Sequence, residues 1–437
     1  MSYEPAPAIE VLAWGRRVGA VGLDPATGWY AFAYAPEWVK SDMELAPLHM
    51  PLRTEPYEFP QLSRTTFYGL PPLIADSLPD KFGNALVDAW MAEQGIAGND
   101  ITPLDRLAYA ADRAVGALEF RPPARDTESQ PPTAVQLADL VLAARLTVRG
   151  EFASDETAHS ALQQLIQVGT SAGGARAKAV VAFNPRTFQV RSAYAEHEDG
   201  FEQWMIKLDG VSSTGMDGHG DELGASAQYG RVEYAYSEMA KAAGIDMTPC
   251  QLLAEGPRRH FMTKRFDRGP AGERFHVLSL CGMADLDYNL IATHSYDQYL
   301  QSVTALGLEP EELAQAYRRM VFNVVAANHD DHTKNFAFMR SEGDRWHLTP
   351  AYDVTHAHNP ASQWTTRHLM SVNAKFEGIT LEDLYAVGER NFAPGYRQIV
   401  RSVQDVVAEW PSFAAGAGVD NETTAFIAAD LDRLSPR

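Results

Sequence analysis

One segment rich in proline and charge divides the chain and limits what it can fold into. Residues 121–134, RPPARDTESQPPTA, contain four prolines and show no apolar periodicity. Such a composition is typical of a linker. We therefore expect a domain boundary at this segment, and a chain of 437 residues is long enough for two or three domains.

The part before the linker predicts a small β-rich domain. The strand-like runs 11–23 and 29–34 are joined by the turn sequence DPATG, and aromatic residues alternate along one face of the second run: Tyr30, Phe32 and Tyr34. A helix is expected over 81–95, where four apolar residues fall at helical spacing: Phe82, Leu86, Trp90 and Met91. We therefore expect a hairpin followed by helices.

The part after the linker changes character along its length. Strands are expected at 179–183, 201–208 and 260–266, with a helix at 232–245 between them, and beyond about 285 the pattern is mostly helical. The predicted fold class is α+β, with a mixed front half and a helical back half. We expect domains at 1–125, 126–265 and 266–437.

Composition and charge exclude several classes of protein. The net charge of −20 opposes unaided binding to nucleic acid and suits a basic protein partner. The chain has no apolar window of transmembrane length, and its first residues, MSYEPAPAIE, do not form a signal peptide. Cys250 and Cys281 lack C-x-x-C spacing and fit a reducing compartment. We expect a cytoplasmic protein with no membrane partner.

A polar cluster, NHDDHTKN at 328–335, follows the apolar run 320–327. Asp330 precedes Asn335 by five residues, which is the interval between the catalytic aspartate and the metal-binding asparagine of protein kinases. A short hairpin is expected next, and Asp353 then stands where a kinase has its second metal ligand. A few hard oxygen ligands, completed by water and phosphate, are what Mg²⁺ prefers.

The same cluster allows a second interpretation, a metal-dependent phosphohydrolase. His329, Asp331 and His332 would then be ligands, because adjacent His-Asp pairs can hold divalent metals. Such a site needs further histidines from other elements. His356 and His358 are the nearest candidates.

A glycine-rich stretch, VGTSAGGARAKAVV at 168–181, contains the pattern G-x-S-x-G of the hydrolase nucleophile elbow. The elbow needs a strand before the serine and a helix after it, whereas here the predicted order is reversed. Glycine backbone with Arg176 and Lys178 suits phosphate instead. Lys207, which closes the next predicted strand, resembles the kinase lysine that holds phosphates, with Glu233 as a candidate partner.

Four stretches in this order, VGTSAGGARAK, WMIKL, NHDDHTKN and LTPAYD, resemble the HipA family of serine/threonine kinase toxins. The resemblance covers nearly the whole chain, because it extends to further segments: 14–34, 67–83, 112–120, 264–268 and 368–380. It implies a two-lobed, kinase-like fold that uses ATP and Mg²⁺. One departure is Ala177, where many relatives have proline.

The resemblance also implies roles for particular residues. Asp330 would be the catalytic base, Asn335 and Asp353 would hold Mg²⁺, and Ser171 would be autophosphorylated, with Thr170 as a neighbouring acceptor. The residues implied in ATP binding are Gly173, Gly174, Ala175, Arg176, Lys178, Lys207, Lys264, Phe266, His332 and Tyr352. In the same cluster, three residues are expected to shape the loop or contact the substrate: Asp331, Thr333 and Lys334.

The partners implied by the resemblance are a helix-turn-helix antitoxin of HipB type and a protein substrate, such as an aminoacyl-tRNA synthetase. DNA would be reached only through the antitoxin. A different class of function stays open at this point: a degenerate kinase that binds ATP and an antitoxin-like partner without transferring phosphate.

Overall fold

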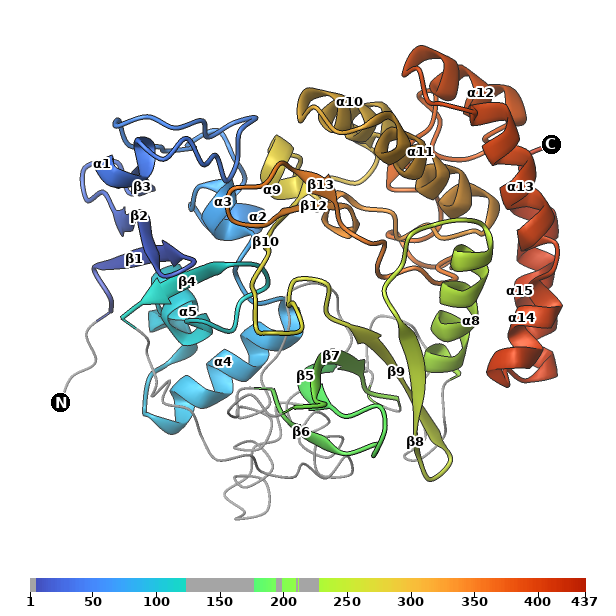
Figure 1. Cartoon of the computed structure of the whole chain (residues 1–437), viewed down its shortest axis with the longest axis horizontal. Helices are drawn as coiled ribbons and strands as arrows, with labels where there is room; N and C mark the ends of the chain where they lie inside the picture. Colours follow the sequence, from blue (N-terminus) through green and yellow to red (C-terminus); the bar gives the residue numbers. More distant parts are fainter. Residues whose placement is uncertain (1–4, 123–176, 194–198, 210, 212–227) are drawn as a thin grey trace. The chain divides into compact units, whose positions relative to one another are not determined.

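The structure is a computed structural model, and it describes residues 5–122, 177–193, 199–209, 211 and 228–437 (Figure 1). The chain divides into two compact units. The first contains residues 1–225, 262–278 and 340–344, and the second contains 226–261, 279–339 and 345–437. No helix of the described residues is long and apolar enough to cross a membrane.

The first unit begins with a four-stranded sheet of order β3-β2-β1-β4. Its strands are β1 (Ala8–Ala13), β2 (Arg16–Leu23), β3 (Tyr30–Tyr34) and β4 (Leu118–Arg121). Neighbouring strands are antiparallel, so β2 and β3 form the predicted hairpin. Tyr30, Phe32 and Tyr34 are all buried, which confirms the alternation along β3.

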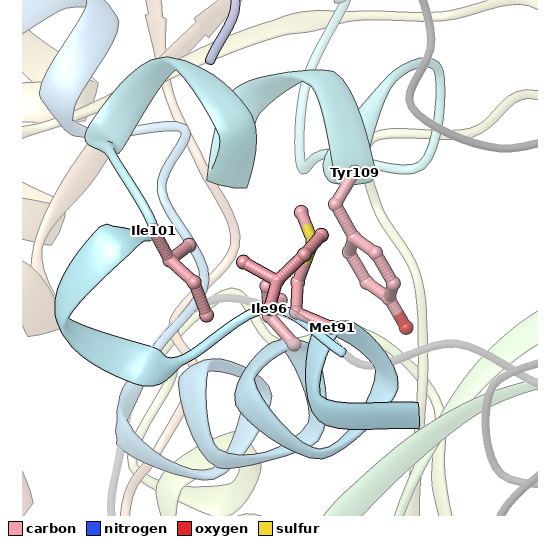
Figure 2. Close-up of a cluster of buried hydrophobic side chains, with 5 residues drawn as sticks. Met91, Ile96, Ile101 and Tyr109 are labelled. Carbon is pink, nitrogen blue, oxygen red and sulfur yellow. The ribbon is translucent and has the colours of Figure 1, made fainter. Parts of the chain in front are cut away.

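Short helices follow this hairpin and pack into a small core. They are α1 (Pro36–Val39), α2 (Arg64–Phe67), α3 (Pro72–Ala75), α4 (Lys81–Glu93), η1 (Gly98–Asp100) and α5 (Pro103–Ala110). The predicted helix is α4, which begins where the Asp80 carboxylate accepts a hydrogen bond from the Gly83 amide. Figure 2 shows the apolar cluster that joins α4, η1 and α5: Val87, Met91, Ile96, Ile101 and Tyr109.

A second sheet has five strands, and three of them, in the first unit, are neighbours in the order β6 (Val190–Ser192), β5 (Lys178–Phe183) and β7 (Glu202–Lys207). Strand β5 is antiparallel to both β6 and β7. The strands predicted at 179–183 and 201–208 are therefore confirmed. The third predicted strand is β9 (Arg258–Lys264), and the boundary between the units falls within it.

The second unit is mainly helical, as expected. Its helices are α8 (Tyr229–Ala242), α9 (Leu280–Ala284), α10 (Tyr296–Ala305), α11 (Pro310–Val325), α12 (Leu381–Arg390), α13 (Tyr396–Val407), α14 (Trp410–Ala417) and α15 (Asn421–Leu434). Within this unit α11 packs against α10 and α13, and α8 packs against α14 (Figure 1).

The remaining strands that the structure describes have two to six residues. β8 (Cys250–Glu255) neighbours β9, and β10 (His276–Ser279) precedes α9. β11 (His294–Ser295) pairs in parallel with β14 (Met370–Ser371). The hairpin expected after the polar cluster is present as β12 (Ala337–Arg340) and β13 (His347–Leu348), with Phe338 opposite Leu348.

Helix α11 ends directly before the polar cluster. Pro310 occupies its first turn, and Glu309 and Glu312 form a capping box in which each side chain accepts a hydrogen bond from the other's backbone. From Met320 to Val325 every side chain is buried. The apolar run 320–327 is therefore the buried end of α11 and a fixed support for the loop that follows.

Candidate active site

The polar cluster begins with a sharp turn at the end of α11. Ala327 has a φ of 50°, in the left-handed region. Asn328 then bonds back to Asn323 twice, from its backbone amide to the Asn323 carbonyl at 2.9 Å and from Nδ2 to Oδ1 at 3.0 Å. These bonds stop the helix and turn the chain into a loop supported from below by α11.

The loop brings Asn335 back to Asp330. One 3₁₀ turn, η2 (Thr333–Asn335), shortens the path between them, and Asn335 Nδ2 donates to the Asp330 carbonyl at 2.7 Å. The Thr333 hydroxyl anchors this turn by donating to the Leu286 carbonyl at 2.7 Å. Because the amide nitrogen of Asn335 is used in this way, its Oδ1 is the atom that can serve a cation.

Asp353 lines the same pocket as Asn335, together with Asp331 and Tyr352. Two hydrogen bonds fix the segment that carries it: Tyr352 Oη donates to the Lys334 carbonyl at 2.7 Å, and Arg319 donates to the Thr349 carbonyl at 2.6 Å. The structure thus brings together the two predicted metal ligands. A carboxylate and a carboxamide oxygen are a donor set that fits Mg²⁺.

The predicted base is accessible. The Asp330 side chain is 42% exposed, and its Oδ1 lies 3.8 Å from Nε2 of His332. The ring of His332 lies 5.6 Å from that of Tyr288, and Tyr288 also lies under the Lys334 ammonium, 5.2 Å from its ring centre. A half-exposed carboxylate beside a polar, partly aromatic surface can accept a proton from an incoming hydroxyl group.

Three of the four histidines of the phosphohydrolase interpretation have other hydrogen-bond partners. His329 Nδ1 faces the Thr365 carbonyl at 3.1 Å, while His356 and His358 both face the Asp430 carboxylate, at 3.1 and 2.7 Å. Burial, with the nearby imidazole of His368, lowers the pKa of His329 to about 2. Among the residues that the structure describes, no three His, Cys, Asp or Glu side chains could hold a metal together. That interpretation therefore lacks a ligand set.

The lysines predicted to bind ATP lie in the first unit. Lys178 and Lys207 stand directly opposite each other on β5 and β7. Lys178 is almost fully buried and pairs with the Asp80 carboxylate at 3.0 Å, and Lys264 pairs with Glu202 at 2.7 Å.

The remaining residues predicted to contact the nucleotide are Phe266 and the glycine-rich loop. Phe266 is half-buried. The glycine-rich loop lies outside the described residues, with Thr170, Ser171, Gly173, Gly174, Ala175 and Arg176. The ATP-binding roles, and the pairing of Lys207 with Glu233, stay predictions.

Buried carboxylates that accept several hydrogen bonds were not predicted from the sequence. Asp267 accepts two hydrogen bonds from Arg265, one from Arg268 and one from the Gly116 amide. Burial alone would raise the pKa of Asp267, but the two guanidinium groups hold it well below its usual range. The mixed charges of KRFDR at 264–268 indicate local ion pairs. They do not predict the distant partner Gly116.

Comparisons with known proteins agree with this architecture. Residues 9–121 match the model of the HipA N-terminal domain, and residues 170–410 match that of the HipA-like C-terminal domain. Y4dM of Sinorhizobium fredii, named as a candidate kinase, is 28% identical over 148 residues. That match covers 30% of this chain and 35% of the relative, so the chain matches only about a third of that protein.

A solved structure extends the likeness over the whole chain. HipA of Shewanella oneidensis MR-1, from a complex with HipB and operator DNA, has a TM-score of 0.64 at 15% identity. The match covers 98% of this chain and 95% of that one, which confirms the predicted α+β, HipA-like fold. The two family models cover the β-rich front of the chain and the polar cluster at 328–335, and the chain belongs to the HipA family.

Proposed function

We propose that the chain is an ATP- and Mg²⁺-dependent protein serine/threonine kinase of HipA type. The observation that carries this proposal is the joint geometry of the polar cluster. Asn335 is hydrogen-bonded to the Asp330 carbonyl, and it lines one pocket with Asp353. A base next to two oxygen ligands for Mg²⁺ is the arrangement of the protein kinases, which supports this proposal.

Each residue has a defined task in the proposed reaction. Asp330 accepts the proton of the substrate hydroxyl as that oxygen attacks the γ-phosphorus, and the bond to the bridging oxygen of ADP breaks. Asn335 and Asp353 would hold Mg²⁺, which neutralises charge on the phosphates when bound. His332 and Tyr352 border the site. The work of the protein is therefore positioning and charge stabilisation, with no covalent intermediate.

The remaining parts of the proposal concern phosphate binding and regulation. Lys207 and the backbone of 173–176 would contact the phosphates of ATP, with Lys264 and Phe266 beside the adenine, whereas the ammonium group of Lys178 is held by Asp80 in a buried ion pair. Phosphorylation of Ser171 adds nearly two negative charges to the loop that must accept ATP, so it should switch the enzyme off.

The proposed partners follow from the family. The Shewanella HipA structure contains HipB and operator DNA. We expect this chain to bind a helix-turn-helix antitoxin of that type and to reach DNA only through it, since a net charge of −20 disfavours direct contact. The proposed substrate is a protein involved in translation, such as an aminoacyl-tRNA synthetase.

The test is to incubate the purified protein with γ-labelled ATP and Mg²⁺ and to map the labelled peptides by mass spectrometry. We expect label on Ser171 in the wild type and in the control Asp432→Asn, which changes an exposed carboxylate. Asp330→Asn should label at least about 100-fold more slowly, because general-base catalysis contributes about 10²–10⁴. Equal labelling of all three proteins would overturn the role of Asp330.

A further inference from the structure

Asp331 is buried beside the half-exposed Asp330. Its side chain has no exposed surface, and both of its carboxylate oxygens accept hydrogen bonds. Oδ2 accepts from Tyr296 Oη and from His368 Nδ1, each at 2.8 Å, and Oδ1 accepts from the Leu369 backbone amide at 2.7 Å. An ionised carboxylate is costly to bury, and three donors offset that cost.

The donors come from segments that are distant in sequence. Tyr296 is the first residue of α10, whereas His368 and Leu369 precede β14. Burial and the neighbouring Asp331 carboxylate raise the pKa of Tyr296 well above its usual value, so its hydroxyl keeps the proton that it donates. The carboxylate thus connects two separate segments to one point of the loop.

A chain of side-chain hydrogen bonds extends from this carboxylate to the start of the loop. The Tyr296 hydroxyl, which donates to Asp331, also accepts from Asn323 Nδ2 at 3.0 Å. Asn323 Oδ1 in turn accepts from Asn328 Nδ2 at 3.0 Å. Both ends of the segment 328–331 are therefore fixed to the same buried network, and Asp330 lies within that segment.

We propose that Asp331 is a positioning residue for phosphoryl transfer, which fixes the backbone that carries the base Asp330. This inference rests on the proposed kinase function. A base must lie within about 3 Å of the hydroxyl proton that it takes, and a misplacement of about 1 Å can cost about 100-fold in rate. Because the Asp330 side chain is half-exposed, few contacts of its own fix its position. The buried neighbour Asp331 fixes the backbone of Asp330 instead.

The experiment follows the phosphorylation of Ser171 at increasing ATP concentrations, which gives a maximal rate constant (kcat) and a KM for ATP, in Asp331→Asn and in a matched control, Asp383→Asn. Asp383 is also a buried carboxylate with several donors, but these donors are not site residues: Asn373, Lys375 and Thr380. We expect Asp331→Asn to lower kcat by about 10- to 100-fold with KM for ATP changed less than about twofold. Asp383→Asn should lose stability and keep its kcat.

A second variant keeps the inference testable if Asp331→Asn fails to fold. Tyr296→Phe removes one donor and leaves those of His368 and Leu369, so kcat should fall by about 3- to 10-fold with KM unchanged. A kcat within twofold of wild type in either folded variant would overturn the inference alone. A wild-type protein that transfers no phosphate would overturn the kinase proposal, and this inference with it.

Discussion

At the scale of single residues, Asp353 combines a carboxylate of the proposed metal site with an unusual backbone. Its φ is 55°, in the left-handed region, which aspartate and asparagine tolerate better than most residues. Asp353→Asn should therefore keep the backbone and remove one charge from the proposed cation site. We expect the Mg²⁺ concentration for half-maximal phosphoryl transfer to rise about tenfold, the effect of about 1.4 kcal/mol of lost binding. Initial rates across a Mg²⁺ titration measure it.

Asp285→Asn is a matched control for this change. Asp285 also has a left-handed backbone, with a φ of 56°, and it ends α9 without lining the pocket of Asn335 and Asp353. The Mg²⁺ requirement of this control should equal that of the wild type. An unchanged requirement in Asp353→Asn would contradict its assignment as a metal ligand.

At the scale of elements, α4 begins at Asp80, whose carboxylate makes two interactions. One Asp80 oxygen caps the helix at Gly83, and the other pairs with Lys178 of β5 at 3.0 Å. Both side chains are at least 96% buried. Asp80→Ala should lower the free energy of unfolding by about 3–5 kcal/mol, because it leaves Lys178 as a buried, uncompensated charge. Urea-induced unfolding measures the loss.

Two further variants separate the cap from the ion pair. Asp420→Ala removes a capping aspartate from α15 whose backbone partner, Thr423, lies at the surface, so it should cost only about 1 kcal/mol. The double variant Asp80→Leu with Lys178→Met should recover much of the loss, because well-packed apolar pairs replace buried ion pairs at little cost. A loss of only about 1 kcal/mol in Asp80→Ala would mean that the ion pair contributes nothing measurable.

Elements with strong local signals were predictable from the sequence. The β2–β3 hairpin, α4, α11 and the β12–β13 hairpin were expected from turn residues, caps and apolar periodicity. The spacing of Asp330 and Asn335 predicted that they belong to one site, and a hydrogen bond joins the two residues, while their catalytic roles stay predictions. The donors of Asp331 were not predictable, since His368 lies 37 residues away and only the tertiary fold brings it close. Local patterns carry no information about such partners.

At the scale of the whole molecule, each unit contains a buried histidine that is held neutral. Burial lowers the pKa of His276 in the first unit to about 4 and that of His329 in the second to about 2. Around His276, the Leu45 carbonyl opposes this shift and Arg340 adds to it. Around His329, the imidazoles of His368, His358 and His356 add to the shift. In the unfolded chain both histidines take up protons near pH 6.5.

Protonation below pH 6.5 therefore favours the unfolded state. Stability should be full above about pH 7 and should fall as the pH drops from 6.5 to 4.5, by up to about 1.4 kcal/mol per pH unit for each histidine. Denaturant unfolding at several pH values measures the slope. His329→Gln should flatten it in this window, and a slope that is the same with and without His329 would contradict its neutral, buried state.

The most direct test of the proposed kinase activity is the rate of γ-phosphate transfer from ATP at saturating ATP and Mg²⁺, in wild-type protein and in Asp330→Asn. The account predicts phosphate incorporated into protein by the wild type, and a rate at least about 100-fold lower in a variant that still binds ATP. ATP binding by the wild type with no phosphorylated product would contradict it and would leave a nucleotide-binding module in its place.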